Sequence, residues 1–255
     1  MKKKAHLKID PRTRAVVKEP VQEPVRVESE LPAPEPIKLS ADIKQAQASQ
    51  QGNGKAAPQT QAPQAPTGEL KLDLACGQSP REGFEGVDLY SKDAKHKVDL
   101  FRFPWPWATS SVDELNSSHF IEHIPMTYLC KKHGHEQLPC EGAPDLFFAF
   151  FDECYRILKP QGKMHIVVPT CRSERAFQDP THRRFIAQAT FFYLSADWRK
   201  GNKLDHYLVK CNFTGDVNFS FDASIQSRHE EVQKELFQHA WNVMQDWLVV
   251  LRAVK

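Results

Sequence analysis

From residue 69 onward, short apolar runs alternate with polar turns along the chain. Residues 69–75 (ELKLDLA), 84–90 (FEGVDLY) and 96–101 (HKVDLF) have the length and the apolar content of short strands. Residues 111–124 (SVDELNSSHFIEHI) predict a fourth strand that runs into a turn. Residues 163–170 (KMHIVVPT) and 246–255 (DWLVVLRAVK) predict two further strands.

Two segments have the periodicity of helices instead. Residues 144–162 carry apolar side chains at helical spacing and end in a Lys-Pro-Gln-Gly sequence that predicts a helix stop followed by a turn. The apolar positions are Leu146, Phe147, Phe150, Phe151, Cys154, Ile157 and Leu158. Residues 228–244 predict a second helix. Strands that alternate with helices indicate an α/β fold, in which a mostly parallel sheet is covered by helices on both faces.

The first part of the chain has a different composition. Residues 1–66 contain nine of the 18 prolines, 11 lysines and arginines and seven acidic residues, and no cysteine or aromatic residue. A segment of this kind does not bury enough apolar area to offset its ordering entropy. We therefore expect residues 1–67 to be a disordered tail and residues 68–255 to form one domain. The tail is either a solvated linker or a tether to a partner.

Charge and hydropathy exclude several protein classes. The net charge of +2 does not indicate a nucleic-acid-binding protein, although it does not rule one out. No run approaches the 18 to 20 apolar residues of a membrane span, and the first residues contain no apolar signal segment. The six cysteines lack paired spacing, so reduced thiols and a cytoplasmic location are expected.

The turn after the first predicted strand favours a nucleoside over a dinucleotide. Cys76-Gly77-Gln78-Ser79-Pro80 offers one glycine and then a proline, whereas a pyrophosphate-binding turn has a G-x-G-x-x-G sequence before a helix. Asp88 ends the second predicted strand, where an acidic residue can accept hydrogen bonds from ribose hydroxyls. A nucleoside with an amino-acid end beside the turn fits this pattern better than NAD or a sugar nucleotide.

Taken in order, LDLACG, GVDLY, VDLFRFPWPW, SVDEL, SHFIEHIP and ECYRILKPQGKMHIVVP resemble the class I S-adenosylmethionine-dependent methyltransferases. The similarity is to the small bacterial and phage-type members of the methyltransferase type 11 group. It covers about residues 70–170, and AFQDPTHRRFI and NKLDHYLVKCNF extend it to about residue 212. The resemblance implies a Rossmann-like sheet with an antiparallel last strand, and a substrate or lid segment over residues 171–212.

The resemblance also implies which residues bind S-adenosylmethionine. It places Asp73, Ala75 and Gly77 near the methionine moiety and Asp88 at the ribose. It places Asp99 and Leu100 by the adenine, and Ser118 and His119 beside the methyl donor. Ten residues separate Gly77 from Asp88, too few for a helix between two strands. The first crossover helix is therefore expected to be a stub or absent.

Histidines and acidic residues gather after the fourth predicted strand. If the turn is helical, His119, Glu122 and His123 share one face, which suits a half-site for a divalent metal. The pattern is similar to the E-x-x-E-H metal motif of the small-RNA 2′-O-methyltransferases and the ubiquinone-type O-methyltransferases, with His119 in place of the first glutamate. His182 is the candidate for the histidine that completes such a site. Acid–base or architectural roles remain alternatives.

Residues 178–185 (QDPTHRRF) form a second candidate. Asp179 and His182 are candidate catalytic residues beside His119 and His123, and Arg183 and Arg184 would suit an anionic acceptor. An N-capped helix start is the alternative. A third candidate, a zinc site, is formed by Cys130, His133, His135 and Cys140, although their spacing is not that of known zinc fingers.

These observations predict a methyltransferase that modifies an O or N nucleophile of an unidentified acceptor. The alternative is a catalytically inactive scaffold whose tail binds a partner. S-adenosylmethionine is the expected cofactor, with a divalent metal as a further option, and no membrane association is expected.

Overall fold

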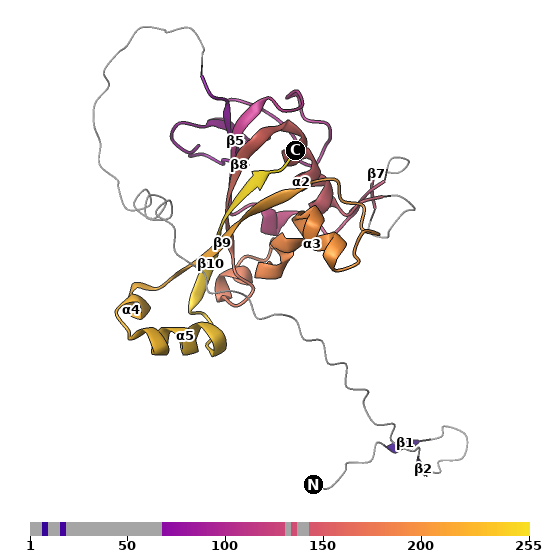
Figure 1. Ribbon diagram of the computed structural model, residues 1–255, viewed down its shortest axis with the longest axis vertical. Coiled ribbons are helices and arrows are strands. Elements are labelled where there is room, and N and C mark those ends of the chain that lie inside the picture. Colours follow the sequence, from indigo (N-terminus) through magenta and orange to yellow (C-terminus); the bar gives the residue numbers. More distant parts are fainter. Residues whose placement is uncertain (1–6, 10–15, 19–67, 131–133, 137–142) are drawn as a thin grey trace. The chain divides into compact units, whose positions relative to one another are not determined.

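The computed structural model describes residues 7–9, 16–18, 68–130, 134–136 and 143–255, without the side chains of residues 129–142 (Figure 1). The predicted tail, residues 1–67, lies outside the described residues except for two short strands. These are β1 (Leu7–Ile9) and β2 (Val16–Lys18), which pair antiparallel. They belong to a unit separate from the rest of the chain.

A six-stranded sheet forms the centre of the second unit. Its strands are β3 (Lys71–Leu74), β4 (Glu85–Val87), β5 (Val112–Ser118), β8 (Leu158–Pro169), β9 (Phe213–Phe221) and β10 (Met244–Ala253). Their order across the sheet is β4-β3-β5-β8-β10-β9. Five strands run in the same direction and β10 runs opposite to them. The predicted Rossmann-like sheet, mostly parallel with an antiparallel last strand, is confirmed.

The edge beyond β4 is reduced. The third predicted strand, residues 96–101, contributes only a parallel bridge between His96 and Val87. If this bridge is counted as a third strand beyond β4, the strand order is that of a doubly wound sheet. In such a sheet, successive strands are added on one side of the first strand and then, from the fourth strand on, on its other side. Here these strands are β3 and β5, so the switch point lies between the residues that follow Leu74 and Ser118. The chain passes from β3 to β4 without a helix, as the ten-residue spacing predicts.

The main helix, α2 (Leu146–Ile157), lies where its periodicity predicts. The Asp145 side chain caps it by accepting a hydrogen bond from the Phe147 N–H at 2.8 Å. Phe150 and Phe151 are fully buried in the core against the sheet. The helix stops at Ile157, as the Lys-Pro-Gln-Gly sequence predicts, but the expected turn at residues 159–162 lies within β8, where the pairing with β5 is interrupted between Leu158 and Lys163. Gln161 adopts a left-handed conformation there, with φ 62°.

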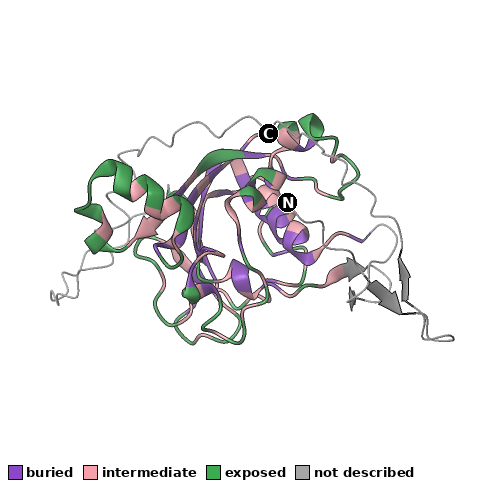
Figure 2. Ribbon diagram, turned by 90° about the horizontal axis from the view of Figure 1, so that it is seen from below, coloured by how far each residue is buried: buried purple, intermediate pink, exposed green. Residues whose placement is uncertain are grey.

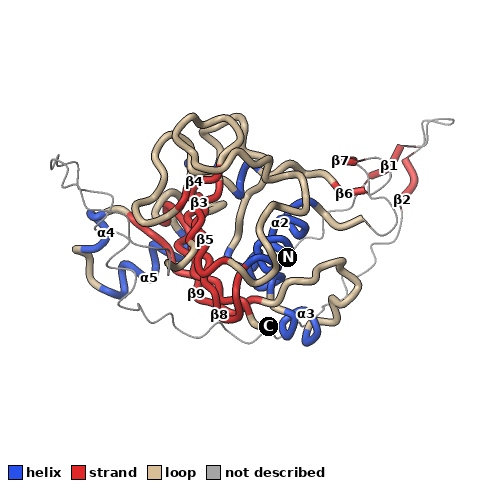
Figure 3. The backbone as a smooth tube through the Cα atoms, turned by 90° about the horizontal axis from the view of Figure 1, so that it is seen from above, coloured by secondary structure: helices blue, strands red, loops and turns tan. Residues whose placement is uncertain are grey.

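The remaining helical elements lie in two connections. Between β8 and β9 are η2 (Glu174–Ala176), η3 (Gln188–Leu194) and α3 (Ala196–Gly201), and between β9 and β10 are α4 (Ala223–Gln226) and α5 (Glu230–His239). A short turn, η1 (Ile121–His123), follows β5, and β6 (Tyr128–Cys130) pairs antiparallel with β7 (Gly134–Glu136). Figure 3 shows α2 and α3 to one side of the strands and α4 and α5 to the other.

Two sequence predictions near the C-terminus need correction. The helix expected over residues 228–244 ends at His239, since Ala240 is extended, Asn242 has φ 66° and Met244 already belongs to β10. The strand β9 was not predicted. It carries Gly215 and Asp216 in its first half, and both residue types are depleted in strands. A side chain at Gly215 would lie 2.0 Å from the Val250 carbonyl oxygen, so close strand packing requires the glycine.

Burial follows this architecture. Figure 2 shows buried residues concentrated on the strands and α2, and exposed residues on α4 and α5. The connections after β8 and β9 both leave the sheet at the carboxyl ends of its parallel strands. This is the edge at which ligands bind in open α/β sheets.

Candidate functional site

Two residues at the switch point have a left-handed backbone. Ala75 follows β3 with φ 55° and His119 follows β5 with φ 52°. This conformation is uncommon for residues other than glycine and is enriched at functional sites. The chain therefore turns sharply away from the sheet at the ends of two neighbouring strands.

Asp73 joins three segments beneath this turn. The side chain is 4% exposed and accepts hydrogen bonds from the Arg81 N–H at 2.8 Å and from the Asn116 amide at 2.7 Å. The Arg81 guanidinium in turn donates to the Asn116 side-chain oxygen at 2.8 Å. Asp73 thus fixes the loop after β3 to β5. Neither Arg81 nor Asn116 was singled out in the sequence; the polar Asn116 inside a strand pattern was the available signal.

Asp88 holds the other side of the same loop. Its carboxylate accepts hydrogen bonds from the N–H groups of Gly77 at 3.2 Å and of Tyr90 and Ser91 at 2.8 Å each. Burial acts to raise the pKa of Asp88, but the hydrogen bonds from Ser91, Tyr90 and Gly77 outweigh it and lower the pKa below its ordinary value. The carboxylate is therefore ionised at neutral pH and contacts the turn directly.

Gly86 allows the loop to lie against β4. A Cβ atom at Gly86 would lie 2.7 Å from the Cys76 sulfur and 2.9 Å from Cγ of Pro80. Both distances are shorter than van der Waals contact. The absence of a side chain on β4 therefore lets the segment from Cys76 to Pro80 pass close over the strand.

The other residues expected at the cofactor lie nearby in the chain but differ in exposure. The Asp99 carboxylate accepts a hydrogen bond from the Phe101 N–H at 2.9 Å, and Leu100 is buried in the core. Phe101 stacks on Phe120 with the ring centroids 5.6 Å apart, which brings this segment next to the end of β5. Ser118 is exposed at that end.

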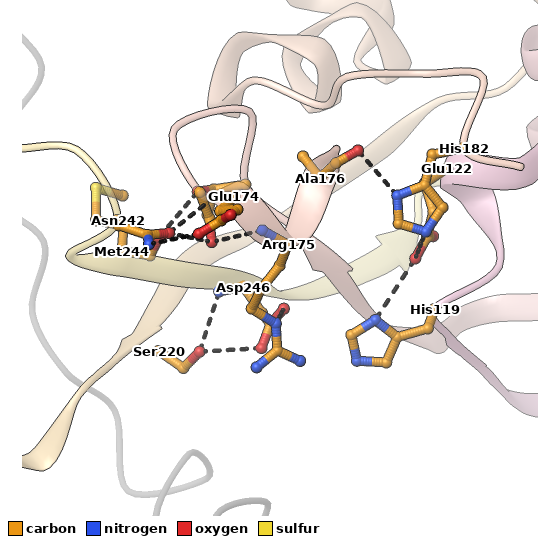
Figure 4. A network of polar contacts seen from close by, with 12 residues as sticks. His119, Glu122, Glu174, Arg175, Ala176, His182, Ser220, Asn242, Met244 and Asp246 are labelled. Carbon is orange, nitrogen blue, oxygen red and sulfur yellow. Dashed lines mark hydrogen bonds and ion pairs between the residues drawn. The ribbon is translucent and has the colours of Figure 1, made fainter. Parts of the chain in front are cut away.

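Three of the four residues expected to bind a metal converge beside β5. Glu122 lies in η1 and is 1% exposed, although its side chain ends in a carboxyl group. Nε2 of His182 lies 4.0 Å from Oε1 of Glu122 (Figure 4). The His123 and His182 rings are in edge contact, with their centroids 4.7 Å apart. One ligand atom from each of Glu122, His123 and His182 lies within 4.8 Å of the others. The fourth, His119, approaches only Glu122, with 3.5 Å between Nδ1 and Oε1, and its side chain is 39% exposed.

The loop over residues 178–185 supplies His182 and, through the Thr181 hydroxyl, a contact to Nδ1 of His123 at 3.1 Å. Asp179 accepts hydrogen bonds from both the N–H and the hydroxyl of Thr181, at 2.7 Å each. No helix begins in this loop, so the helix-start alternative is wrong. The Arg184 guanidinium contacts the Ile124 and Pro125 carbonyls and the Asp145 carboxylate, whereas Arg183 is exposed.

A cavity of about 630 Å³ lies beside this region. It is bounded by the N-terminal part of α2 and by residues of the 171–212 segment, among them Arg184, Phe185, Tyr193 and Tyr207. A second cavity, of about 880 Å³, lies along α2 and the 207–210 segment. Asp73, Gly77, Asp88 and His119 line neither of them. The two cavities are therefore separate from the expected cofactor loop.

Some predictions fall on residues whose side chains are not described. The zinc alternative at Cys130, His133, His135 and Cys140 is one of them. Among the described helices, none has the length and apolar character needed to cross a membrane.

No family model and no curated protein matches the chain. Solved structures similar to it include an S-adenosylmethionine-dependent methyltransferase from Archaeoglobus fulgidus, at 19% identity and a TM-score of 0.47 over 72% of this chain and 86% of that one. Another is a putative S-adenosylmethionine-dependent methyltransferase from Listeria monocytogenes, at 12% identity and a TM-score of 0.42 over 73% of this chain and 90% of that one. A third is a geranyl diphosphate methyltransferase in complex with S-adenosylmethionine, at 12% identity and a TM-score of 0.42 over 73% of this chain and 79% of that one. At these TM-scores the fold assignment rests on the strand order.

Proposed function

We propose that residues 68–255 form an S-adenosylmethionine-dependent methyltransferase that acts on an O or N nucleophile. The observation that carries the proposal is the contact between Gly77 and Asp88, which joins the turn after β3 to the acidic residue after β4. The contact lies next to the switch point of a doubly wound sheet, where such folds bind nucleosides. In this position Asp88 would hold the ribose, while Ala75 and Gly77 would lie against the amino-acid end.

The same geometry disfavours a dinucleotide or a sugar nucleotide. Pyrophosphate sites use the N–H groups at the start of a helix that follows the first strand. The described chain passes from β3 to β4 without such a helix, and Pro80 lacks an N–H within the turn. A nucleoside that carries no phosphate needs none of these donors. Asp99 and Leu100 would lie by its adenine.

The end of β5 is the proposed place of reaction. The bound sulfonium supplies the methyl group, and the chain must hold the acceptor in line at about 3 to 3.5 Å from it. The acceptor must also lose its proton to a base whose imidazole or carboxylate lies within hydrogen-bond reach. We assign this role to His119, because it is exposed at the end of β5 and Glu122 lies 3.5 Å behind it. In the transfer, the carbon–sulfur bond would break to leave a neutral thioether, the methyl group would bond to the acceptor, and His119 would take the acceptor's proton.

The 171–212 segment is the proposed acceptor side. It leaves the carboxyl end of β8 and supplies ten of the residues that line the 630 Å³ cavity. Aromatic side chains dominate that lining, among them Phe147, Phe148, Tyr193 and Tyr207. Pockets of this size and apolar character accommodate small organic ligands. Because His119 does not line this cavity, we assign to it the part of the acceptor that lies away from the reacting atom. The exposed Arg183, which precedes the cavity-lining Arg184 in the chain, would suit an acceptor that carries an anionic group.

Calorimetric titration of the full chain with S-adenosylmethionine and S-adenosylhomocysteine tests the proposal. Micromolar binding of both ligands is the expected result, with NAD as a negative control. A methyl-labelled donor would then be used to screen small molecules and macromolecules for label transfer. Absence of binding to either ligand would refute the proposal and favour a scaffold that retains only the fold.

A further inference from the structure

Glu122 is the most unusual charged residue of the described chain. It is 1% exposed, and neither carboxylate oxygen has a hydrogen-bond partner among the described residues. Burying an ionised carboxylate without hydrogen bonds is costly, and such groups are normally paired with a cation or coordinate a metal. In the described part of the chain the hydrogen-bond pattern supplies no cation for it, and the side-chain atoms at ion-pair distance are ring nitrogens of His119 and His182, at 3.5 and 4.0 Å.

His182 faces this carboxylate with its lone pair. Its Nδ1 lies 2.9 Å from the Ala176 carbonyl oxygen, and a carbonyl only accepts, so Nδ1 carries the proton. In the neutral ring Nε2 is then unprotonated, and this atom lies 4.0 Å from Oε1 of Glu122. Two electron-rich atoms thus face each other across a gap in which a cation would satisfy both.

His123 is held in the same tautomer by a chain of two hydrogen bonds. The Thr181 hydroxyl donates its proton to Asp179 at 2.7 Å, so toward Nδ1 of His123, at 3.1 Å, it can only accept. Nδ1 of His123 is therefore protonated and Nε2 is free. Metal-binding histidines characteristically donate their other N–H to a carbonyl or a carboxylate-linked group. Both histidines have this arrangement.

From this geometry we infer a binding site for a divalent first-row transition metal ion, formed by Glu122, His123 and His182. Two imidazoles and one carboxylate suit Zn²⁺, Fe²⁺ or Co²⁺ better than Mg²⁺, which prefers oxygen ligands. Metal–ligand bonds of about 2.1 Å place neighbouring ligands roughly 3 to 4 Å apart. The three ligand atoms lie within 4.8 Å of one another, so closure by about 1 to 2 Å at most completes the set.

Three protein ligands leave coordination positions open for solvent or substrate. Here the role of the ion rests on the proposed function. The site lies at the end of β5, next to His119, so an acceptor hydroxyl bound to the ion would be acidified beside the proposed base. Its proton would pass to His119 and its oxygen would be held for methylation.

Titration of the full, chelator-treated chain with Zn²⁺ and with Co²⁺ tests the site. We expect one equivalent to bind, with at least tenfold weaker binding in Glu122→Gln, His123→Gln and His182→Gln, and no binding of Mg²⁺. His239→Gln, which removes an exposed histidine of α5, is the matched control and should bind as the parent does. Far-ultraviolet circular dichroism verifies that each variant is folded.

Co²⁺ absorption and the unfolding temperature show independently whether the ion binds to Glu122, His123 and His182. Co²⁺ absorption identifies the ligands, because thiolate ligands add a charge-transfer band; such a band, lost in Cys140→Ser, would place the ion on the cysteine–histidine stretch instead. An ion-dependent rise in the unfolding temperature of the parent protein, absent in Glu122→Gln, supports the site without relying on affinity. No binding, or binding unchanged in all three variants, overturns the inference. Titration with S-adenosylmethionine in the absence of metal distinguishes this failure from failure of the proposed function.

Discussion

Nε2 of His182 lies 4.0 Å from the Glu122 carboxylate, and hydrogen bonding to Ala176 fixes the proton of His182 on its other nitrogen. Glu122 comes from the turn after β5, and His182 comes from the loop after β8. The carboxyl edge of the sheet thus brings a buried carboxylate without hydrogen bonds next to the second ring nitrogen of an imidazole. This relationship supports the inferred metal site, and the loop that holds His182 is the part to perturb.

The support of His123 by Thr181 predicts an effect on metal affinity without loss of a ligand. In Thr181→Val the side chain keeps its shape, but the acceptor for the His123 Nδ1–H is removed. Loss of such supporting hydrogen bonds costs about 10- to 100-fold in metal affinity. Calorimetric titration with Zn²⁺ measures the change. Thr214→Val, at an exposed position of β9, is the control, and equal affinity in both variants would contradict the assigned tautomer.

Replacement of Asp88 should abolish cofactor binding. Asp88→Ala removes the carboxylate proposed to hold the ribose and also the acceptor for Gly77, Tyr90 and Ser91. We expect affinity for S-adenosylhomocysteine to fall at least tenfold, with a stability loss of about 1 to 2 kcal/mol from the lost hydrogen bonds. Calorimetry and denaturant unfolding measure the two effects separately. Asp93→Ala, at an exposed position in the following loop, should leave both nearly unchanged.

The close passage of the loop over Gly86 predicts sensitivity to a single methyl group. In Gly86→Ala the new Cβ would lie within 3.0 Å of the Cys76 sulfur and of Pro80, so the loop must move outward. Overpacking of this kind costs about 1 to 3 kcal/mol. We expect a lower unfolding free energy together with several-fold weaker binding of S-adenosylhomocysteine. In Gly201→Ala the added methyl meets no atom within 4 Å, so unchanged binding there and in Gly86→Ala alike would show that the loop is not part of the cofactor site.

Asp113 predicts the acid sensitivity of the sheet. Its hydrogen bonds and ion pair with Lys159, at 2.7 and 2.8 Å, together with the hydrogen bond from the Leu70 N–H, lower the pKa of the carboxyl group despite opposing burial. Because the folded-state pKa lies below the unfolded one, Asp113 contributes stability at neutral pH that is lost as the pH falls through the folded-state pKa.

We therefore expect Asp113→Asn to be less stable than the parent at pH 7, and the difference to shrink between about pH 5 and pH 2. Urea unfolding at several pH values measures it, with Asp216→Asn on β9 as an exposed control. A difference that is independent of pH would show that Asp113 acts only through its shape.

The sequence by itself determined the features that depend on neighbouring residues. Apolar periodicity predicted α2 and five of the six strands of the central sheet, and the spacing from Gly77 to Asp88 predicted a connection without a helix. His119, Glu122 and His123 were expected on one side of a turn, because their separations alone bring residues of a helical turn together. Each of these features depends only on residues that are close to one another in the sequence.

Only the tertiary structure decided which distant residues complete each arrangement. It brought His182 and Thr181 to Glu122 and His123, made Asp88 an acceptor for three N–H groups, and paired β9 with β10 despite Gly215. It also ended α5 at His239 and began β8 at Leu158. These outcomes depend on how strands and loops pack against one another across the sheet, and long-range packing overrides the weak local preferences of loops and segment ends.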